Sequence, residues 1–193
     1  MSLIRVTAPT AEPVTLDEAK QHLRVLGNDD DAYIIRLITA ARHVVETNTA
    51  RALITQTWDW KFGSFPCDGL NVPLAPLVSV TSISYVDIAG ATVVWPAAQY
   101  AVLDAGAVTA TGRIVPAYGE SWPSVRGLPN DIIVRFVAGY GDAATVPDEI
   151  RWAMLLIIGE LYERREDALA GAVINTVPIS AEYLLRPYRS VSF

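Results

Sequence analysis

In residues 138–166, AGYGDAATVPDEIRWAMLLIIGELYERRE, a glycine-rich turn leads into a strongly apolar segment with helical spacing. The first part of this stretch, Gly139 to Ala144, fits the G-x-G-x-x-A pattern of a dinucleotide-binding turn. In its second part the uninterrupted apolar run, residues 152–159, is far shorter than the about 20 residues that a membrane span needs. The helix is therefore expected to be soluble, and the turn is either a nucleotide site or a packing element.

Two features argue against a nucleotide site at this turn. Pro147 disfavours helical backbone at the residue before it, so the helix cannot begin directly at the glycines. The acidic residue expected about 20 positions later should end a second parallel strand, but that place falls on Glu160 in the middle of the helix. We interpret the turn as a link between a strand and a helix.

The helix predicted over residues 147–166 is apolar on nearly all sides, so it must be covered on every face. The N-terminal helices can cover one side, and we expect a neighbouring subunit to cover the rest, with Gly159 allowing close approach. The candidate subunit interface comprises Trp152, Leu155, Leu156, Gly159, Tyr162, Arg164 and Arg165.

Two helices are predicted near the N-terminus. The first begins with a capping box, in which Thr15 is the cap and Glu18 follows three residues later. Its apolar stripe is expected to run to Leu26, with Gly27 just past its end. A second helix follows from about residue 29, and the two should form a hairpin.

Between residues 53 and 138 the apolar period changes to that of strands, with turn signals between short alternating runs. In the run from Val78 to Val86, the apolar side chains change from even to odd positions, which predicts a bulge near Ser82. Because the strands follow one another without helices between them, the sheet is expected to be antiparallel.

The predicted class is therefore α+β, a small helical bundle formed by N- and C-terminal helices with an inserted antiparallel β domain. The expected domains are 1–52 and 139–193 for the discontinuous bundle, including a C-terminal arm at 187–193, and 53–138 for the β domain.

Composition excludes several classes of function. The chain has 193 residues and a net charge of -6, so its surface should repel nucleic acid and anionic lipid. The single cysteine, Cys67, excludes an internal disulfide and a multi-thiolate metal site. The N-terminus reaches Pro9 and Glu12 too soon for a signal peptide, which predicts a cytoplasmic origin.

No residues form a recognisable catalytic, cofactor-binding or metal site. Residues 29–31 are three aspartates without the spacing of a calcium loop, and helix capping explains them. His22 and His43 lie on predicted helices without a partner nucleophile. We expect no enzyme activity, no cofactor and no metal.

An alternative function is a carbohydrate-binding or tail-associated β module. Trp58 and Trp60 share one face of a predicted strand, where they could stack on sugar rings if both were exposed. Aromatic residues on one face of a strand are more often core residues, so this alternative depends on their exposure.

The sequence resembles the head-tail connector (adaptor) family of tailed bacteriophages and gene transfer agents. The matching segments occur in the family's order and cover most of the chain. They are PVTLDEAKQHLR (13–24), DDDAYI (29–34), RIV (113–115), SWP (121–123), VRFVAGYG (134–141), VPDEI (146–150), LYERRE (161–166) and LLRPYR (184–189).

The resemblance implies a structural protein of the virion head-tail junction, present in the host cytoplasm during assembly. It implies a ring, typically dodecameric, beneath the portal protein, with a tail-side connector or tail terminator protein as its other partner. DNA would pass through the ring without sequence-specific binding, and no membrane, enzyme activity or cofactor is implied.

Family connectors commonly engage the portal with a terminal segment. The C-terminal segment, residues 186–193, carries two arginines, no acid, a proline and an apolar end, which suit docking into a groove. The candidate portal-docking arm is Arg186, Pro187, Tyr188, Arg189, Val191 and Phe193.

Overall fold

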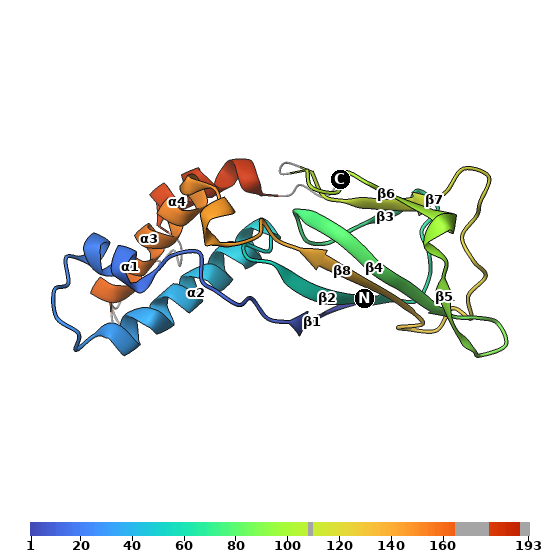
Figure 1. The fold of residues 1–193 in the computed structure, drawn as a ribbon, viewed down its shortest axis with the longest axis horizontal. Helices are drawn as coiled ribbons and strands as arrows, with labels where there is room; N and C mark the ends of the chain where they lie inside the picture. Colours follow the sequence, from blue (N-terminus) through green and yellow to red (C-terminus); the bar gives the residue numbers. More distant parts are fainter. Residues whose placement is uncertain (108–109, 165–177, 190–193) are drawn as a thin grey trace, which may run out of the picture. The chain divides into compact units, whose positions relative to one another are not determined.

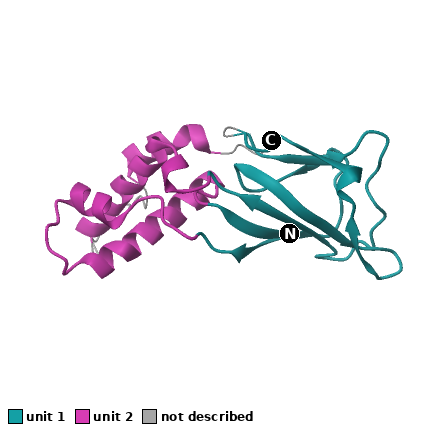
Figure 2. Cartoon of the chain, viewed as in Figure 1, with its two compact units in different colours: residues 1–9, 55–140 teal, residues 10–54, 141–193 magenta. Residues whose placement is uncertain are grey.

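The computed structural model describes residues 1–107, 110–164 and 178–189. The chain divides into two compact units (Figure 2). The β unit consists of residues 1–9 and 55–140, and the helical unit of residues 10–54 and 141–193. The structure combines helices with antiparallel sheets, which confirms the predicted α+β class.

The β unit contains two antiparallel sheets (Figure 1). The larger sheet has the strand order β1-β2-β8-β4-β5, and the smaller has the order β3-β7-β6. The strands are β1 (Ser2–Thr7), β2 (Gln56–Phe62), β3 (Leu70–Asn71), β4 (Leu77–Val86), β5 (Thr92–Trp95), β6 (Tyr100–Leu103), β7 (Arg113–Pro116) and β8 (Ile132–Ala138), with a 3-10 helix η1 (Ala97–Gln99) before β6.

Strand β8 lies at the centre of the larger sheet and alternates between buried and more exposed side chains. Ile132, Val134 and Phe136 are fully buried, whereas Arg135 between them is exposed. The register places Val134 between Trp60 of β2 and Ile83 of β4, which are also buried. One face of this sheet therefore forms the core of the unit.

The two sheets contact each other through small residues and aromatic rings. Gly112 lies against the side chain of Leu77, where any Cβ atom on residue 112 would collide. The ring of Trp95 in β5 lies 5.2 Å, centroid to centroid, from the ring of Tyr100 in β6. These contacts bury the space between the sheets.

The predicted bulge in β4 is confirmed. The pairing of β4 with β8 shifts register between Val80 and Ser82, and a second shift lies between Leu77 and Ser79. Each shift changes whether the odd-numbered or the even-numbered residues of β4 face inward. The apolar pattern of this strand therefore changes along its length.

Strand β1 was not predicted from the sequence. It pairs antiparallel with β2 at the edge of the larger sheet, and all six of its residues are exposed. The structure therefore places residues 1–9 in the β unit, whereas the sequence analysis grouped them with the helices. An exposed edge strand needs no alternating pattern, so its sequence carries little signal.

The helical unit contains four helices (Figure 1) among the described residues. Ile34, Leu37, Ile38 and Val45 of α2 are buried, and so are Ile150, Met154, Ile157 and Ile158 of α3. The helices are α1 (Leu16–Leu23), α2 (Asp31–Thr49), α3 (Asp148–Glu163) and α4 (Ile179–Leu185), with 3-10 helices η2 (Ala143–Thr145) and η3 (Arg186–Tyr188).

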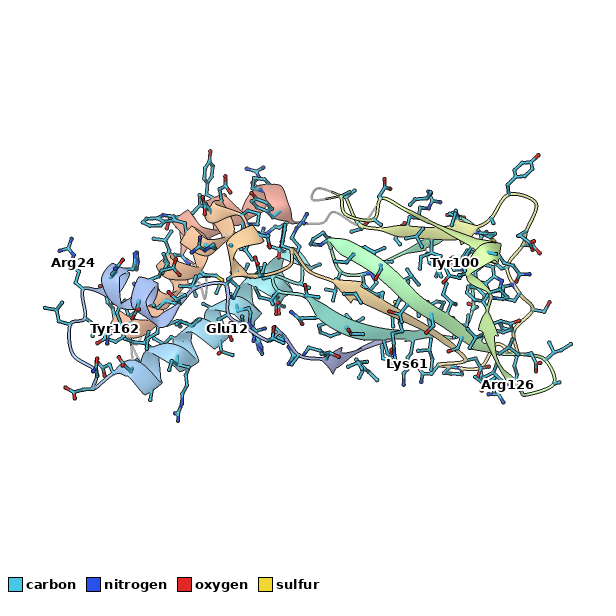
Figure 3. The ribbon with its side chains drawn as sticks, in the orientation of Figure 1. Glu12, Arg24, Lys61, Tyr100, Arg126 and Tyr162 are labelled. Atoms are coloured by element: carbon cyan, nitrogen blue, oxygen red, sulfur yellow. The ribbon has the colours of Figure 1, made fainter. Side chains whose placement is uncertain are left out.

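The first helix begins as predicted but ends earlier. Thr15 and Glu18 form the reciprocal capping box. Arg24 adopts a left-handed conformation with φ of 58° and projects from the unit (Figure 3). The backbone N–H groups of Arg24 and Val25 donate to carbonyls of the last helical turn, which closes the helix. Leu26, predicted to continue the apolar stripe, is therefore 98% exposed.

Candidate functional site

Helix α3 begins after Pro147 and carries its acidic residues at its N-terminal end. Asp148 and Glu149 occupy its first turn, where the helix dipole favours negative charge. Its buried face packs against α1, α2 and α4. Most of this apolar helix is thus covered by its own unit, which leaves one side for interaction with another molecule.

The uncovered side of α3 forms the wall of an open groove of about 480 Å³. Trp152 is 52% exposed and Leu155 is half-buried. Residues from before α1, from α1 and from α4 complete the groove, whose lining consists of Val14, Glu18, Asp148, Glu149, Arg151, Trp152, Leu155 and Leu184. Its floor is apolar and most of its charged groups are acids.

Arg151 of α3 connects the groove wall to α1 and to the segment before it. Its guanidinium donates to Glu18, to the carbonyl oxygen of Pro13 at 3.2 Å and to Asp148 at 3.4 Å. The hydrogen bond from the Thr15 backbone amide, with the Thr15 hydroxyl and Arg151, lowers the pKa of Glu18 below its ordinary value. Glu18 therefore remains an anion whose charge is largely matched by Arg151.

The structure separates the predicted interface residues into two groups. Trp152 and Leu155 line the groove. Gly159 instead faces α1, because a Cβ atom there would lie 3.5 Å from Nε2 of His22. Tyr162 (Figure 3) donates a hydrogen bond to Asp30, at the N-terminus of α2. Gly159 and Tyr162 thus pack within their own unit, where the sequence analysis expected a neighbouring subunit.

The other described interface residues, Leu156 and Arg164, are not among the residues that line the groove. Leu156 is half-buried, and Arg164 is exposed and pairs with Glu160 at 2.9 Å. Arg165 lies outside the described residues.

The first part of the predicted arm is folded onto the helical unit. Arg186, Pro187 and Tyr188 form η3 directly after α4. The Tyr188 hydroxyl donates to Glu149 at 3.0 Å. Arg189 pairs with Glu182 at 2.9 Å, and Val191 and Phe193 lie outside the described residues.

The tryptophans of the β unit do not form an exposed platform. Trp60 is only 4% exposed, and its ring lies 4.6 Å from that of Phe62, centroid to centroid. Trp58 is half-buried beneath the guanidinium of Arg5, which lies 5.9 Å from the ring centroid. The exposure that a sugar-stacking function requires is absent at Trp60.

The residues of the glycine turn form hydrogen bonds with backbone groups of their own chain. The amide of Gly139 donates to the carbonyl oxygen of Pro76 at 3.0 Å. The Asp142 carboxylate accepts from the amides of Ala144 and Thr145, at 3.1 and 3.2 Å. Its negative charge occupies the position at which a nucleotide phosphate would have to bind.

The described ranges, residues 1–107, 110–164 and 178–189, contain neither a metal-binding cluster nor a membrane-spanning helix. No cluster of three or more histidine, cysteine or acidic side chains in these residues is arranged to hold a metal ion. None of the helices in this part of the chain combines the length and the apolar character needed to cross a bilayer.

The comparisons with known proteins identify the class of this protein. Residues 13–85 match the model of the phage gp6-like head-tail connector protein family. No curated protein matches the sequence significantly.

Solved structures of gene transfer agent (GTA) particles match the whole chain. A chain in the neck of an empty GTA particle, computed with C6 symmetry, is 26% identical with a TM-score of 0.80. A chain in the virion of a native GTA particle is 27% identical with a TM-score of 0.77. One in the neck of a native GTA particle, computed with C12 symmetry, is 27% identical with a TM-score of 0.76. Each alignment covers 100% of this chain and 97% of the other.

These matches confirm the class and location predicted from the sequence. The family and the solved neighbours are structural proteins of phage-like particles, and the location is the head-tail junction of the virion. Residues 13–85 are thus similar to the head-tail connector family, and the whole chain is similar to chains in gene transfer agent necks, which supports a head-tail connector protein.

Proposed function

We propose that this protein assembles as a ring of identical subunits beneath the portal, joins the DNA-filled capsid to the tail and forms part of the DNA channel. The observation that carries this proposal is the match of the full chain to proteins in GTA necks. The C6 and C12 symmetries of those necks support a ring, and twelve subunits fit both.

The proposed partners are the portal protein on the head side and a tail-side connector or tail terminator protein on the other. The net charge of -6 supports a channel through which DNA slides without sequence-specific binding. The excess of acidic over basic residues disfavours the phosphate contacts from which DNA affinity arises.

The proposed subunit interface is centred on Trp152 and Leu155. A large aromatic side chain that is half exposed over an apolar floor is typical of protein interfaces, where tryptophan contributes strongly to binding. Leu156 and Arg164 are proposed at its margins. Gly159 and Tyr162 are left out because they contact their own unit.

The proposed portal-docking arm is the tail that contains Arg186, Arg189, Val191 and Phe193. Arg186 and Arg189 are exposed, so both are available to a partner surface. Tyr188 is held by Glu149, so we assign it to the attachment of the tail to the helical unit.

Electron microscopy of the protein mixed with the portal protein of the same particle tests the proposal. We expect a ring that caps the portal in one orientation. The absence of any complex, at concentrations at which both proteins are folded, would overturn the connector function. A chain ending at Arg189 is expected to form rings that no longer attach to the portal, and unchanged attachment would exclude residues 190–193 from the docking arm.

A further inference from the structure

The groove beside Trp152 raises the question of which surface of the neighbouring subunit fills it. In a cyclic ring, each subunit meets its neighbours through two different patches, because the contact is heterologous. The second patch should match the groove in shape and in charge. This inference rests on the proposed ring and identifies that second patch.

The groove favours an apolar side chain next to a cation. Asp148 is exposed at its rim, with a side chain 95% accessible, and Glu149 is exposed beside it. Arg151 is the one cation in the lining and pairs with both Glu18 and Asp148, so the three acids leave the groove with a net negative charge. Trp152 and the other apolar lining residues offer a floor that excludes water when covered.

Helix α2 carries a surface with the complementary properties. Ala32, Ile35, Arg36, Ala40 and His43 recur at helical spacing, and all five are exposed. We call this surface the α2 stripe. Ile35 is 50% exposed, and Arg36 makes no ion pair with another described residue. The stripe thus presents an apolar side chain beside an unmatched positive charge.

The α2 stripe and the groove point in different directions. The buried residues of α2 face the core of the bundle, so the stripe faces outward. The groove is lined by α1, α3, α4 and the segment before α1, without any residue of α2. In Figure 1, α2 borders the helical unit on the side away from α4. Two complementary patches that face apart lead to head-to-tail repetition rather than to a closed pair.

We propose that the α2 stripe of one subunit docks into the groove of the next subunit in the ring. Ile35 covers Trp152 and Leu155, while Arg36 faces the carboxylates of Asp148 and Glu149. Ala32 and Ala40 are small, which lets the indole ring of the neighbour lie close to the helix. The occupant of the groove is therefore a second copy of this chain.

Cysteine cross-linking tests this contact directly. The natural Cys67 is first replaced with serine, which leaves no thiol in the chain. Leu155→Cys is then combined in one chain with Ala32→Cys or Ala40→Cys, which spare Ile35 and Trp152. A disulfide needs Cα atoms within about 7 Å, so it reports direct neighbours only.

We expect oxidation of assembled rings to give a ladder of cross-linked multimers with at least one of the two pairs. Each single-cysteine variant is expected to remain uncross-linked. As a control, Leu155→Cys with Val94→Cys, an exposed position in the β unit, is expected to give no ladder. Rings that form normally but give no ladder with either α2 position would overturn this docking and leave the connector function standing. Failure to form rings even with the portal protein would overturn both.

Charge reversal gives an independent readout in the chain with its natural cysteine. Arg36→Glu places like charges at the contact, and we expect ring formation to need at least about tenfold more protein. Adding Asp148→Arg to Arg36→Glu should restore much of the loss. An unchanged assembly concentration for Arg36→Glu would contradict the proposed contact.

Discussion

Arg51 donates a hydrogen bond from Nε to the backbone carbonyl oxygen of Tyr188, 2.6 Å away and 137 positions later in the sequence. The guanidinium also lies 5.7 Å from the centroid of the Tyr188 ring. Arg51 is only 2% exposed, so this contact secures the last turn of the described chain against a buried cation.

Shortening the chain should therefore have two distinct effects. Removal of residues 187–193 takes away an acceptor from the buried Arg51, and we expect the free energy of unfolding to fall by about 1–3 kcal/mol. Urea denaturation of the truncated and full-length proteins measures the difference. The contact with Arg51 thus makes the start of the C-terminal tail part of the folded unit.

The matched control is a chain that ends at Arg189, which keeps the Arg51 contact. Its urea midpoint is expected to equal that of the full-length protein. Equal midpoints for both truncations would show that the Tyr188 contact contributes nothing to stability.

Gly159 offers a test of packing between α3 and α1. A Cβ atom there meets His22 at ordinary van der Waals distance, so Gly159→Ala should stabilise the helix by about 0.5–1 kcal/mol. Gly159→Leu should instead destabilise by about 1–3 kcal/mol, because the larger side chain has to displace the imidazole. Thermal denaturation distinguishes the two. Equal stability of both variants would mean that α1 does not limit the space.

Gly112 offers the corresponding test between the two sheets of the β unit. Its missing side chain makes room for Leu77, so Gly112→Ala is expected to lower the free energy of unfolding by about 1–3 kcal/mol. Adding Leu77→Ala should relieve the collision without restoring full stability, because it removes a buried side chain. Chemical denaturation measures both variants. Wild-type stability for Gly112→Ala alone would refute the close approach.

The ion pair across β2 and β8 predicts a dependence of stability on pH. Arg135 donates to both carboxylate oxygens of Asp59, at 2.7 and 2.8 Å, and these bonds lower the pKa of Asp59. Because the pKa is lower in the folded state, the ion pair stabilises the fold at neutral pH. This contribution is lost as pH falls from about 4, the pKa of an unfolded aspartate, through the folded pKa.

Asp59→Asn should therefore be less stable than wild type at pH 7 and should lose less stability on acidification. Arg135→Gln is expected to give the same flatter profile, and the double variant should add little further change. Urea midpoints measured between pH 7 and the acid transition test this. Additive effects of the two substitutions would show that the residues act independently.

Local signals in the sequence predicted much of the fold because they report local physics. The capping box at Thr15 and Glu18 is a contact between residues three apart, so its geometry follows directly from spacing. The bulge in β4 was readable because burial on one face forces the apolar parity to change with the register.

The features that were missed are of two kinds, a helix end set by local backbone hydrogen bonds and contacts between residues distant in sequence. The end of α1 is set by backbone bonds that leave Leu26 in solvent, although its apolar character suggested burial. Gly159 lies beside His22 of the same chain, and the sequence could not identify this neighbour. The groove was missed because Val14 and Leu184 join α3 only through tertiary packing.

The alternation of the chain between its two units has a consequence for synthesis. The ribosome delivers the edge strand β1 first, but its partner β2 belongs to a sheet whose central strand ends only at Ala138. The helical unit is completed later, because its fully buried residues Ala181 and Leu185 belong to α4. The β unit is complete once residue 140 has been synthesised, whereas α3 and α4 of the helical unit still have to follow, so we expect the β unit to fold first. The groove, whose lining includes Leu184 of α4, can form only after that.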